Sequence, residues 1–316
     1  MPGQSPNDAQ MKTTKILVTG ANGLLGQKLV DRLSGRPAVE VIATGRGGNR
    51  NPNSEGYAYA EIDAVVQSEV DDVMGLYSPD VVVHAAAMTN VDQCELKPDE
   101  CWELNVKATE NIVRACEKVG AKIVHVSTDF IFDGKEGPYS EKATPNPLSH
   151  YGRSKWAAEQ IVMGAQVPWA IARTMLVYGV VADMSRSNIV LWAKKALESG
   201  QQIKVVDDQF RSPTLVEDLA DGIIHIIMKG RTGVYNLSGP EQMSILDMVK
   251  QVADFWKLDA GLITPVDSGS LNQPAARPPK TGFIILKAQT ELGYRPRTVR
   301  EGLAVVDKQL NLFSLG

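Results

Sequence analysis

The sequence has few of the residues that mark disulfide-bonded, metal-binding or nucleic-acid-binding proteins. Its 316 residues include three cysteines and four histidines, and 6% are aromatic. Cys94, Cys101 and Cys116 make neither a disulfide framework nor a metal-ligand spacing, so we expect buried or half-buried thiols and no metal site. The formal net charge of −4 leaves no basic footprint, which argues against a nucleic-acid partner.

Long apolar runs are also missing. No stretch approaches the roughly 20 apolar residues that span a bilayer, so we expect no membrane partner. Residues 1–14 are polar and lack the apolar stretch of a secretory signal, and we treat them as a tail outside the fold. The composition, 43% hydrophobic and 22% charged, is that of an ordinary globular protein, for which we expect a cytoplasmic location.

Short β-branched runs alternate with longer helical patterns through the first half of the chain. The expected strands are Lys15–Gly20, Val39–Gly45, Tyr57–Asp63, Val81–Ala87, Lys122–Ser127 and Trp169–Thr174. Between them, segments such as Leu24–Leu33 and Trp102–Val119 carry apolar residues at three- and four-residue spacing, as helices do. Continuous apolar strands separated by helices predict a doubly wound, Rossmann-type α/β sheet that binds ligands at the carboxyl ends of its strands.

The pattern changes after Thr174. Helical stretches at Asn188–Glu198, Val216–Met228 and Leu246–Trp256 alternate there with short strands and the Pro-rich segment Gln273–Lys280. Proline removes a backbone donor, so that segment cannot easily supply central strands. We therefore expect a larger domain over residues 12–175 and a smaller C-terminal, substrate-binding lobe over 176–316, with part of 207–230 returning to the main sheet.

A glycine-rich turn follows the first strand. Gly20, Gly23 and Gly26 stand where that strand meets the first helix. Glycines allow close backbone approach there, and the helix N-terminus attracts a pyrophosphate. Glycines also serve ordinary turns, but the strand–turn–helix context favours a dinucleotide site. The residues expected to line it are Gly20, Asn22, Gly23, Leu24, Leu25 and Gly26, with Ala85, Ala86 and Ala87 after the fourth strand.

The end of the second strand bears on which dinucleotide binds. An NAD-binding protein usually places a carboxylate there for the ribose 2′-hydroxyl, whereas this strand ends in Ala43-Thr44-Gly45-Arg46. The fork of Arg46 suits a 2′-phosphate, which favours NADP(H), although loop arginines are also often solvated surface charges. Asp63 is a candidate for the adenine amino group, and it could equally cap the next helix.

A candidate catalytic pair stands at the start of a later helix. Tyr151 and Lys155 are four residues apart and share one helical face. A tyrosine with its usual pKa near 10 is a poor acid–base catalyst at neutral pH, and a neighbouring ammonium stabilises its phenolate. Such pairs are common on surfaces, but here the fifth strand ends in Ser127-Thr128-Asp129 and brings hydroxyls to the same edge of the sheet.

These features together, with Asn105 in CWELNVKAT, resemble the extended short-chain dehydrogenase/reductase family over nearly the whole chain. Four segments most closely resemble dTDP-4-dehydrorhamnose reductases: AAAMTNVDQCE, VSTDFIFDGKEGPYSE, DDQFRSPTLVEDLA and AARPPKTGF. The resemblance implies NADPH-dependent reduction of a 4-keto-6-deoxy sugar nucleotide. In that reaction Thr128 hydrogen-bonds the carbonyl, Tyr151 donates the proton, and Lys155 tunes Tyr151 and binds ribose.

The resemblance also implies a set of substrate-binding residues: Thr89, Val91, Asp92, Asp129, Asn188, Arg211 and Arg277. The two arginines suit a pyrophosphate because of their fork geometry. This chain departs from the reductases at Leu176, where they carry a tryptophan, and at Arg211, where they carry a small residue, so the sugar is left open. The reductases can bind Mg²⁺ at a subunit contact, but the sequence identifies no ligands for it, and a homodimer is also left open.

Two other functions stay open from the sequence. Epimerases and dehydratases of the same fold usually retain NAD, so Arg46 and the missing carboxylate argue against them. A non-catalytic NADP-binding regulatory subunit, like the methionine adenosyltransferase β subunit, also resembles these reductases, and the intact Thr128, Tyr151 and Lys155 argue for an enzyme instead. Of the histidines, we expect His84, His125 and His225 to be core or strand-edge residues, and His150 has no expected role.

Overall fold

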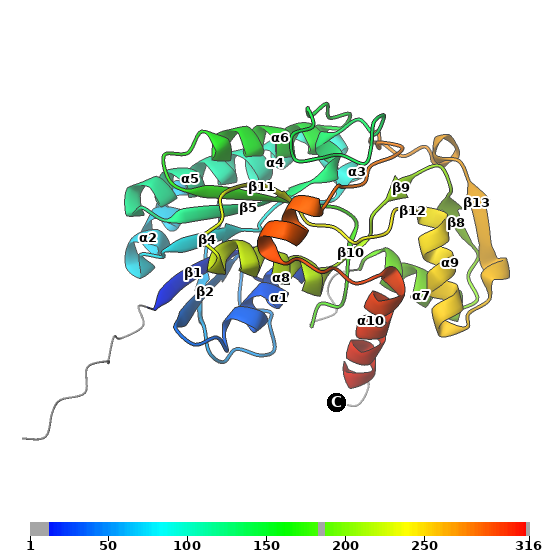
Figure 1. Ribbon diagram of the computed structural model, residues 1–316, viewed down its shortest axis with the longest axis horizontal. Coiled ribbons are helices and arrows are strands. Elements are labelled where there is room, and N and C mark those ends of the chain that lie inside the picture. Colours follow the sequence, from blue (N-terminus) through cyan, green and yellow to red (C-terminus); the bar gives the residue numbers. More distant parts are fainter. Residues whose placement is uncertain (1–12, 183–186, 314–316) are drawn as a thin grey trace, which may run out of the picture.

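The computed structural model describes residues 13–182 and 187–313, and a seven-stranded parallel sheet forms its centre (Figure 1). The strand order is β11-β6-β5-β4-β1-β2-β3. The bounds of these strands are β1 Thr14–Thr19, β2 Val39–Gly45, β3 Ala58–Glu61, β4 Val81–His84, β5 Lys122–Thr128, β6 Trp169–Thr174 and β11 Gly233–Asn236. The predicted doubly wound α/β architecture is therefore confirmed.

Helices cover both faces of this sheet, because alternate strand residues point to opposite sides. Ile16 and Val18 of β1 pack in one apolar cluster with α1 (Leu24–Leu33) and α8 (Val216–Met228). Leu17 packs on the other face, where three further helices lie (Figure 1): α2 Gln67–Tyr77, α5 Ala108–Val119 and α6 His150–Met163.

A smaller lobe with its own apolar cluster follows the main part of the sheet. It contains the helices α7 Ile189–Glu198, α9 Ile245–Trp256 and α10 Val299–Phe313, and the paired strands β8 Ile203–Val206 and β13 Ile263–Val266. Two further short pairs join β7 (Val177–Tyr178) to β10 (Thr214–Leu215), and β9 (Phe210–Arg211) to β12 (Met243–Ser244).

The structure differs from the sequence expectation in several elements. The strands β3 and β4 are shorter than the segments expected at Tyr57–Asp63 and Val81–Ala87. The single helix expected over Trp102–Val119 consists of α4 (Pro98–Trp102), a π-helical turn over Glu103–Lys107, and α5. The chain returns to the main sheet through α8 and then β11, and β11 lies just beyond the predicted 207–230. A four-residue strand is too short for hydrophobic periodicity to reveal.

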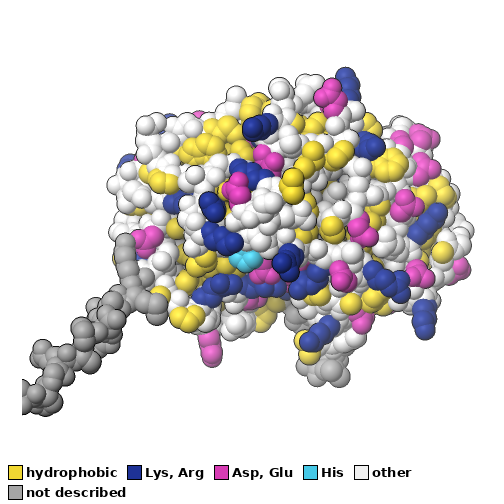
Figure 2. All heavy atoms as spheres, in the orientation of Figure 1, with side chains coloured by type: hydrophobic (Ala, Val, Ile, Leu, Met, Phe, Trp, Pro, Cys, Tyr) yellow, Lys and Arg dark blue, Asp and Glu magenta, His cyan; other side chains and the backbone are white. Residues whose placement is uncertain are grey.

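The surface carries a mixture of charges and scattered apolar side chains. On the face shown in Figure 2, lysine and arginine side chains lie among aspartate and glutamate side chains. Across residues 13–182 and 187–313, no helix combines the length and apolar character needed to cross a membrane. All three cysteines are buried and free, as predicted.

Candidate active site

The carboxyl ends of β1, β4 and β5 bring the predicted site residues to one edge of the sheet. Thr19 pairs in register with His84, and His84 pairs with His125. The glycine-rich turn follows directly, and Gly20 has a positive φ of 69°. A Cβ at Gly20 would lie 2.8 Å from the Ala86 nitrogen, so only glycine lets the turn pack against the chain that leaves β4.

The N-terminus of α1 is shaped to receive an anion. Gly23 is its N-cap without a side-chain cap, and no acidic residue stands in the first turn of the helix, which opens with Leu24 and Leu25. A Cβ at Gly26 would lie 2.2 Å from the Gly20 oxygen, so this glycine lets the turn close onto the helix. Uncapped amides at the positive end of the helix dipole fit a dinucleotide pyrophosphate.

Asn22 shapes the loop that would border the adenosine half of the cofactor. Its Nδ2 donates to the Gly48 oxygen at 3.1 Å and to the Tyr59 hydroxyl at 2.9 Å. Its Oδ1 accepts from the Arg50 amide at 2.8 Å. The buried Asn22 side chain therefore ties the glycine-rich turn to the loop after β2.

Arg46 is open to solvent at the end of β2. Its side chain is 64% exposed, and Nη1 lies 4.0 Å from Oδ2 of Asp63, which is also partly exposed. Asp63 Oδ1 accepts from the Val65 amide, so Asp63 also turns the chain after β3. Glu61, which the sequence did not single out, accepts from the Gly47 amide at 3.0 Å. An exposed pair at this distance holds Arg46 weakly, so the guanidinium can engage another anion.

The candidate catalytic residues come from the end of β5 and the start of α6. Thr128 ends β5, and its Oγ1 donates to Asp129 Oδ1 at 3.2 Å. Tyr151 lies in the first turn of α6, which Ser149 caps through the Gly152 amide. A Cβ at Gly152 would lie 2.2 Å from the Phe130 oxygen, so glycine lets α6 pack against the segment that follows Thr128.

Burial sets the charge states of this site. It raises the pKa of the Tyr151 hydroxyl, an effect that a hydrogen bond with Thr128 opposes and the Asp129 carboxylate reinforces. Tyr151 is therefore a protonated phenol at neutral pH, which suits a proton donor. Burial lowers the pKa of Lys155 to about 8, although negative charge on Glu159 and on Cys101 would raise it.

Asn105 holds the loop after β4 in place from the π-helical turn. Its Oδ1 accepts from the Met88 amide at 2.7 Å, and its Nδ2 donates to the Met88 oxygen at 3.1 Å and to Ser154 Oγ at 3.0 Å. Ser154 Oγ in turn donates to the backbone carbonyl oxygen of Tyr151 at 2.8 Å. The loop that carries Ala85–Ala87 and Thr89 is thereby tied to the helix that carries Tyr151.

Asp129 and Arg211 face one another in the interior. The Arg211 Nε lies 3.4 Å from Asp129 Oδ2, which also accepts from Thr281 Oγ1 at 2.5 Å. Burial raises the pKa of Asp129, and the Arg211 cation opposes that shift. The guanidinium also donates to the oxygens of Phe210 and Pro278, both at 2.7 Å. Arg211 therefore holds the Pro-rich segment against the end of β5.

Arg277 and Asp92, two predicted substrate-binding residues, bind each other in the structure. The guanidinium donates to both carboxylate oxygens, at 3.0 and 2.8 Å, and the Arg277 cation lowers the pKa of Asp92. The Ala275 amide also donates to Asp92 at 3.3 Å. This contact fastens the Pro-rich segment to α3 (Val91–Leu96), beside the apolar cluster in which Val91 packs with Tyr151.

Asn188 has a structural role that the sequence did not predict. It is the N-cap of α7, where its Oδ1 accepts from the amides of Val190 and Leu191. Its Nδ2 donates to the Gly179 oxygen at 2.7 Å. These contacts fix the start of α7 against the strand pair of β7 and β10.

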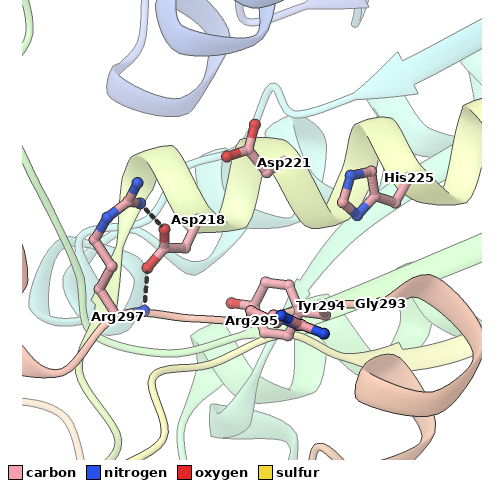
Figure 3. Close-up of a pocket in the computed structure, with 7 residues that line it drawn as sticks. All are labelled: Asp218, Asp221, His225, Gly293, Tyr294, Arg295 and Arg297. Carbon is pink, nitrogen blue, oxygen red and sulfur yellow. Dashed lines mark hydrogen bonds and ion pairs between the residues drawn. The ribbon is translucent and has the colours of Figure 1, made fainter.

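A separate cavity lies away from these residues. It has a volume of about 280 Å³ and lies between α8 and residues 293–297 (Figure 3). In it the Arg297 side chain and amide both bind the Asp218 carboxylate, and His225 lines one end. Over the described ranges, no group of three or more histidine, cysteine or acidic side chains could hold a metal, so the Mg²⁺ site has no support.

Comparison with known proteins agrees with this geometry. Residues 14–311 match the family described as the RmlD substrate binding domain. The spore coat polysaccharide biosynthesis protein SpsK of Bacillus subtilis is 32% identical over 92% of this chain and 95% of its own. The methionine adenosyltransferase 2 subunit beta of Xenopus tropicalis is 31% identical over 82% of this chain and 77% of its own.

Solved structures of dTDP-4-dehydrorhamnose reductases have the same fold. The enzyme from Clostridium acetobutylicum superposes with a TM-score of 0.84 at 28% identity, over 94% of this chain and 100% of its own. The enzyme from Bacillus anthracis, in complex with NADP, gives 0.81 at 28% identity, over 94% and 99%. Together with the glycine-rich turn and the Thr128, Tyr151 and Lys155 positions, these matches show that the chain belongs to the RmlD substrate binding domain family of extended short-chain dehydrogenase/reductases.

Proposed function

We propose that the protein is an oxidoreductase that uses NADPH to reduce the C4 keto group of a nucleotide-linked 4-keto-6-deoxy sugar. The main support is the buried Tyr151 near Thr128, with Lys155 one helical turn away, at the edge of the sheet that bears the glycine-rich turn. A neutral phenol next to a second hydroxyl is the donor set that a carbonyl oxygen needs as it becomes an alkoxide.

The proposed mechanism assigns one task to each of the three side chains. NADPH, when bound, supplies the hydride. Thr128 turns its hydroxyl from Asp129 toward the substrate carbonyl, and Tyr151 hydrogen-bonds the same oxygen and transfers its proton to it. The Lys155 ammonium stabilises the phenolate that remains. Because the pKa of Lys155 is about 8, most of this side chain is charged at neutral pH.

The cofactor preference rests on Arg46. Its guanidinium is exposed and only loosely paired with Asp63, so a ribose 2′-phosphate can engage it by charge-assisted hydrogen bonds. The Bacillus anthracis reductase, a family relative, was solved with NADP. An epimerase or dehydratase that retains NAD fits this strand end less well, since no carboxylate follows β2 for the 2′-hydroxyl.

The substrate proposal places the nucleotide-sugar diphosphate near Arg277. That guanidinium is partly exposed, and a diphosphate would compete with Asp92 for it. Thr89, Val91 and Asp92 border the same edge, and we keep them with Asn188 as proposed substrate residues. Arg211 is better suited to positioning than to direct contact, because its guanidinium is buried against Asp129 and the Pro-rich segment.

A regulatory subunit is the second candidate function. It is favoured by the relatives named methionine adenosyltransferase 2 subunit beta, which are 31% and 29% identical to this chain, against 32% and 28% for the two relatives named for polysaccharide or glycan biosynthesis. A regulatory role would require a partner protein for function, whereas a reductase would act alone. Turnover by the isolated chain therefore separates the two.

The test is NADPH oxidation by the purified chain with a panel of nucleotide-linked 4-keto-6-deoxy sugars. The proposal expects turnover of at least one linked sugar, poor turnover of the free sugar, and a large loss in Tyr151→Phe. NADH in place of NADPH controls for cofactor choice. If no linked sugar is reduced while the folded chain still binds NADPH, the reductase proposal fails and a role as a regulatory subunit is favoured.

A further inference from the structure

Among the residues that the structure describes, the amine of Lys155 has two hydrogen-bonding partners, and both come from β5. Its Nζ donates to the Val126 oxygen at 2.7 Å and lies 3.2 Å from His125 Nε2. Both Lys155 and His125 are buried. A carbonyl can only accept a hydrogen bond, whereas an imidazole nitrogen can accept or donate, so the His125 contact depends on which ring nitrogen carries the proton.

The other ring nitrogen limits what His125 can do. Within the part of the chain that the structure describes, the buried His125 Nδ1 has no hydrogen-bond partner. If Nε2 accepts from the Lys155 ammonium, Nδ1 carries the single ring proton and has nowhere to pass it. His125 can therefore orient Lys155, but it cannot conduct a proton away through its far side.

We propose that His125 is a positioning residue, a neutral imidazole protonated on Nδ1 whose Nε2 accepts from the Lys155 ammonium and fixes it against the middle of β5. The contact restricts the positions open to the amine of Lys155, which lies one helical turn from Tyr151 on α6. The catalytic part of this inference rests on the proposed reductase function, whereas the ring protonation does not.

The charges around Lys155 support a neutral imidazole there. Burial lowers the pKa of His125 well below its usual range, and the neighbouring Lys155 cation and His84 lower it further. The titratable groups that face Lys155 are Glu159 on its own helix, Cys101 from α4, and the two histidines from β4 and β5. An imidazolium at His125 would face the Lys155 ammonium across 3.2 Å, so the ammonium keeps the proton.

His84 provides a matched control. It is buried next to His125, with ring centroids 5.4 Å apart, and its two nitrogens bind the hydroxyls of Thr19 at 2.8 Å and Thr109 at 3.1 Å. His84 therefore shares the burial and the strand position of its neighbour without touching the lysine amine. A change at His84 disturbs packing as much, but it leaves both hydrogen bonds of Lys155 in place.

The first experiment needs no substrate. Long-range ¹H–¹⁵N spectra of the cofactor-free chain report the protonated nitrogen of each of its four histidines. We expect His125 to stay neutral and protonated on Nδ1 across about pH 5–8, and its Nε2 signal to shift in Lys155→Met. Three results would overturn the proposal: a proton on Nε2 of His125, a change in the protonation of His125 within this pH range, or an Nε2 signal that does not shift in Lys155→Met.

The second experiment measures the alkaline limb of the kcat/KM profile. His125→Leu removes the acceptor, and because a hydrogen bond to a charged donor is lost, the limb should move down by about one to two pH units. His125→Gln offers a carbonyl acceptor and should restore most of the shift, while His84→Gln should lower thermal stability without moving the limb. If His125→Leu folds and the alkaline limb of its kcat/KM profile does not move, the positioning role is contradicted. If the wild type shows no turnover, only the reductase function is contradicted.

Discussion

Replacing Glu159 with alanine should destabilise the protein strongly, because it leaves the Arg173 guanidinium buried without its carboxylate partner. Glu159 and Arg173 are 0% and 2% exposed, and three hydrogen bonds of 2.6–3.2 Å join them. Arg173 also donates to the backbone carbonyl oxygen of Glu141, and its guanidinium carbon lies 5.5 Å from the centre of the Phe132 ring. Removing one partner of a buried ion pair costs about 3–5 kcal/mol, a large part of a typical folding free energy of about 5–15 kcal/mol.

Thermal unfolding gives the simplest measure of this loss. With a shift of about 2–4 °C for each kcal/mol, Glu159→Ala should lower Tm by about 6–20 °C. Asp254→Ala is the matched control, since it also breaks a carboxylate–guanidinium pair, at 2.9 Å, but one that is 71% and 72% exposed. That exposed pair should contribute at most about 1 kcal/mol, so its loss should change Tm only slightly.

A double variant refines the test. Glu159→Leu with Arg173→Met removes both charges together and should regain most of the stability, because no buried charge is left unpaired. The backbone carbonyl oxygen of Glu141 loses its hydrogen bond from Arg173 in the double variant, so the recovery of Tm should stay incomplete. If Glu159→Ala and Asp254→Ala lower Tm equally, or if the double variant is no better than Glu159→Ala alone, the reasoning from burial is refuted.

Four further predictions concern the site. Arg46→Ala should weaken NADPH binding about tenfold or more and NADH binding little, by calorimetry, and equal losses would remove the 2′-phosphate role. Tyr151→Phe should lower kcat by about 10²–10⁴-fold at unchanged cofactor Kd, and near-normal turnover would exclude it as the acid. Since the lowered pKa of Lys155 is about 8, kcat/KM should fall as pH rises past that value, and Lys155→Met should lack this limb. Arg277→Ala should raise KM for the nucleotide-linked sugar, whereas an unchanged KM would assign that arginine to bracing the Pro-rich segment.

Much of the central sheet and its covering helices follows from periodicity. The bounds of β2, β6, α1 and α8 agree with the segments expected from sequence, because long apolar runs and 3.6-residue patterns are strong signals. The π-helical turn at Glu103–Lys107 was not predicted, since a single inserted residue leaves the apolar pattern almost unchanged. Yet that turn contains Asn105, which ties the loop after β4 to α6.

The site was predictable in its residue types more than in its pairings. Sequence motifs singled out Thr128, Tyr151 and Lys155, and the fold brings the ends of β5 and α6 together. They did not reveal that Arg277 pairs with Asp92, because those residues are 185 positions apart. The contact between His125 and Lys155 was missed for a similar reason, since a histidine within an apolar strand gives no sign of what its ring faces.

Transfer of deuterium from the nicotinamide ring to the sugar tests directly whether NADPH delivers hydride to the keto carbon. The purified chain would be given NADPH deuterated at the transferable C4 position, with a nucleotide-linked 4-keto-6-deoxy sugar, and the product analysed by NMR and mass spectrometry. Direct hydride transfer with Tyr151 as the acid predicts one deuterium at C4 of the sugar with the wild type, and strongly reduced incorporation with Tyr151→Phe. A reduced sugar without deuterium, or equal incorporation by Tyr151→Phe, would contradict direct hydride transfer at a carbonyl that Tyr151 protonates.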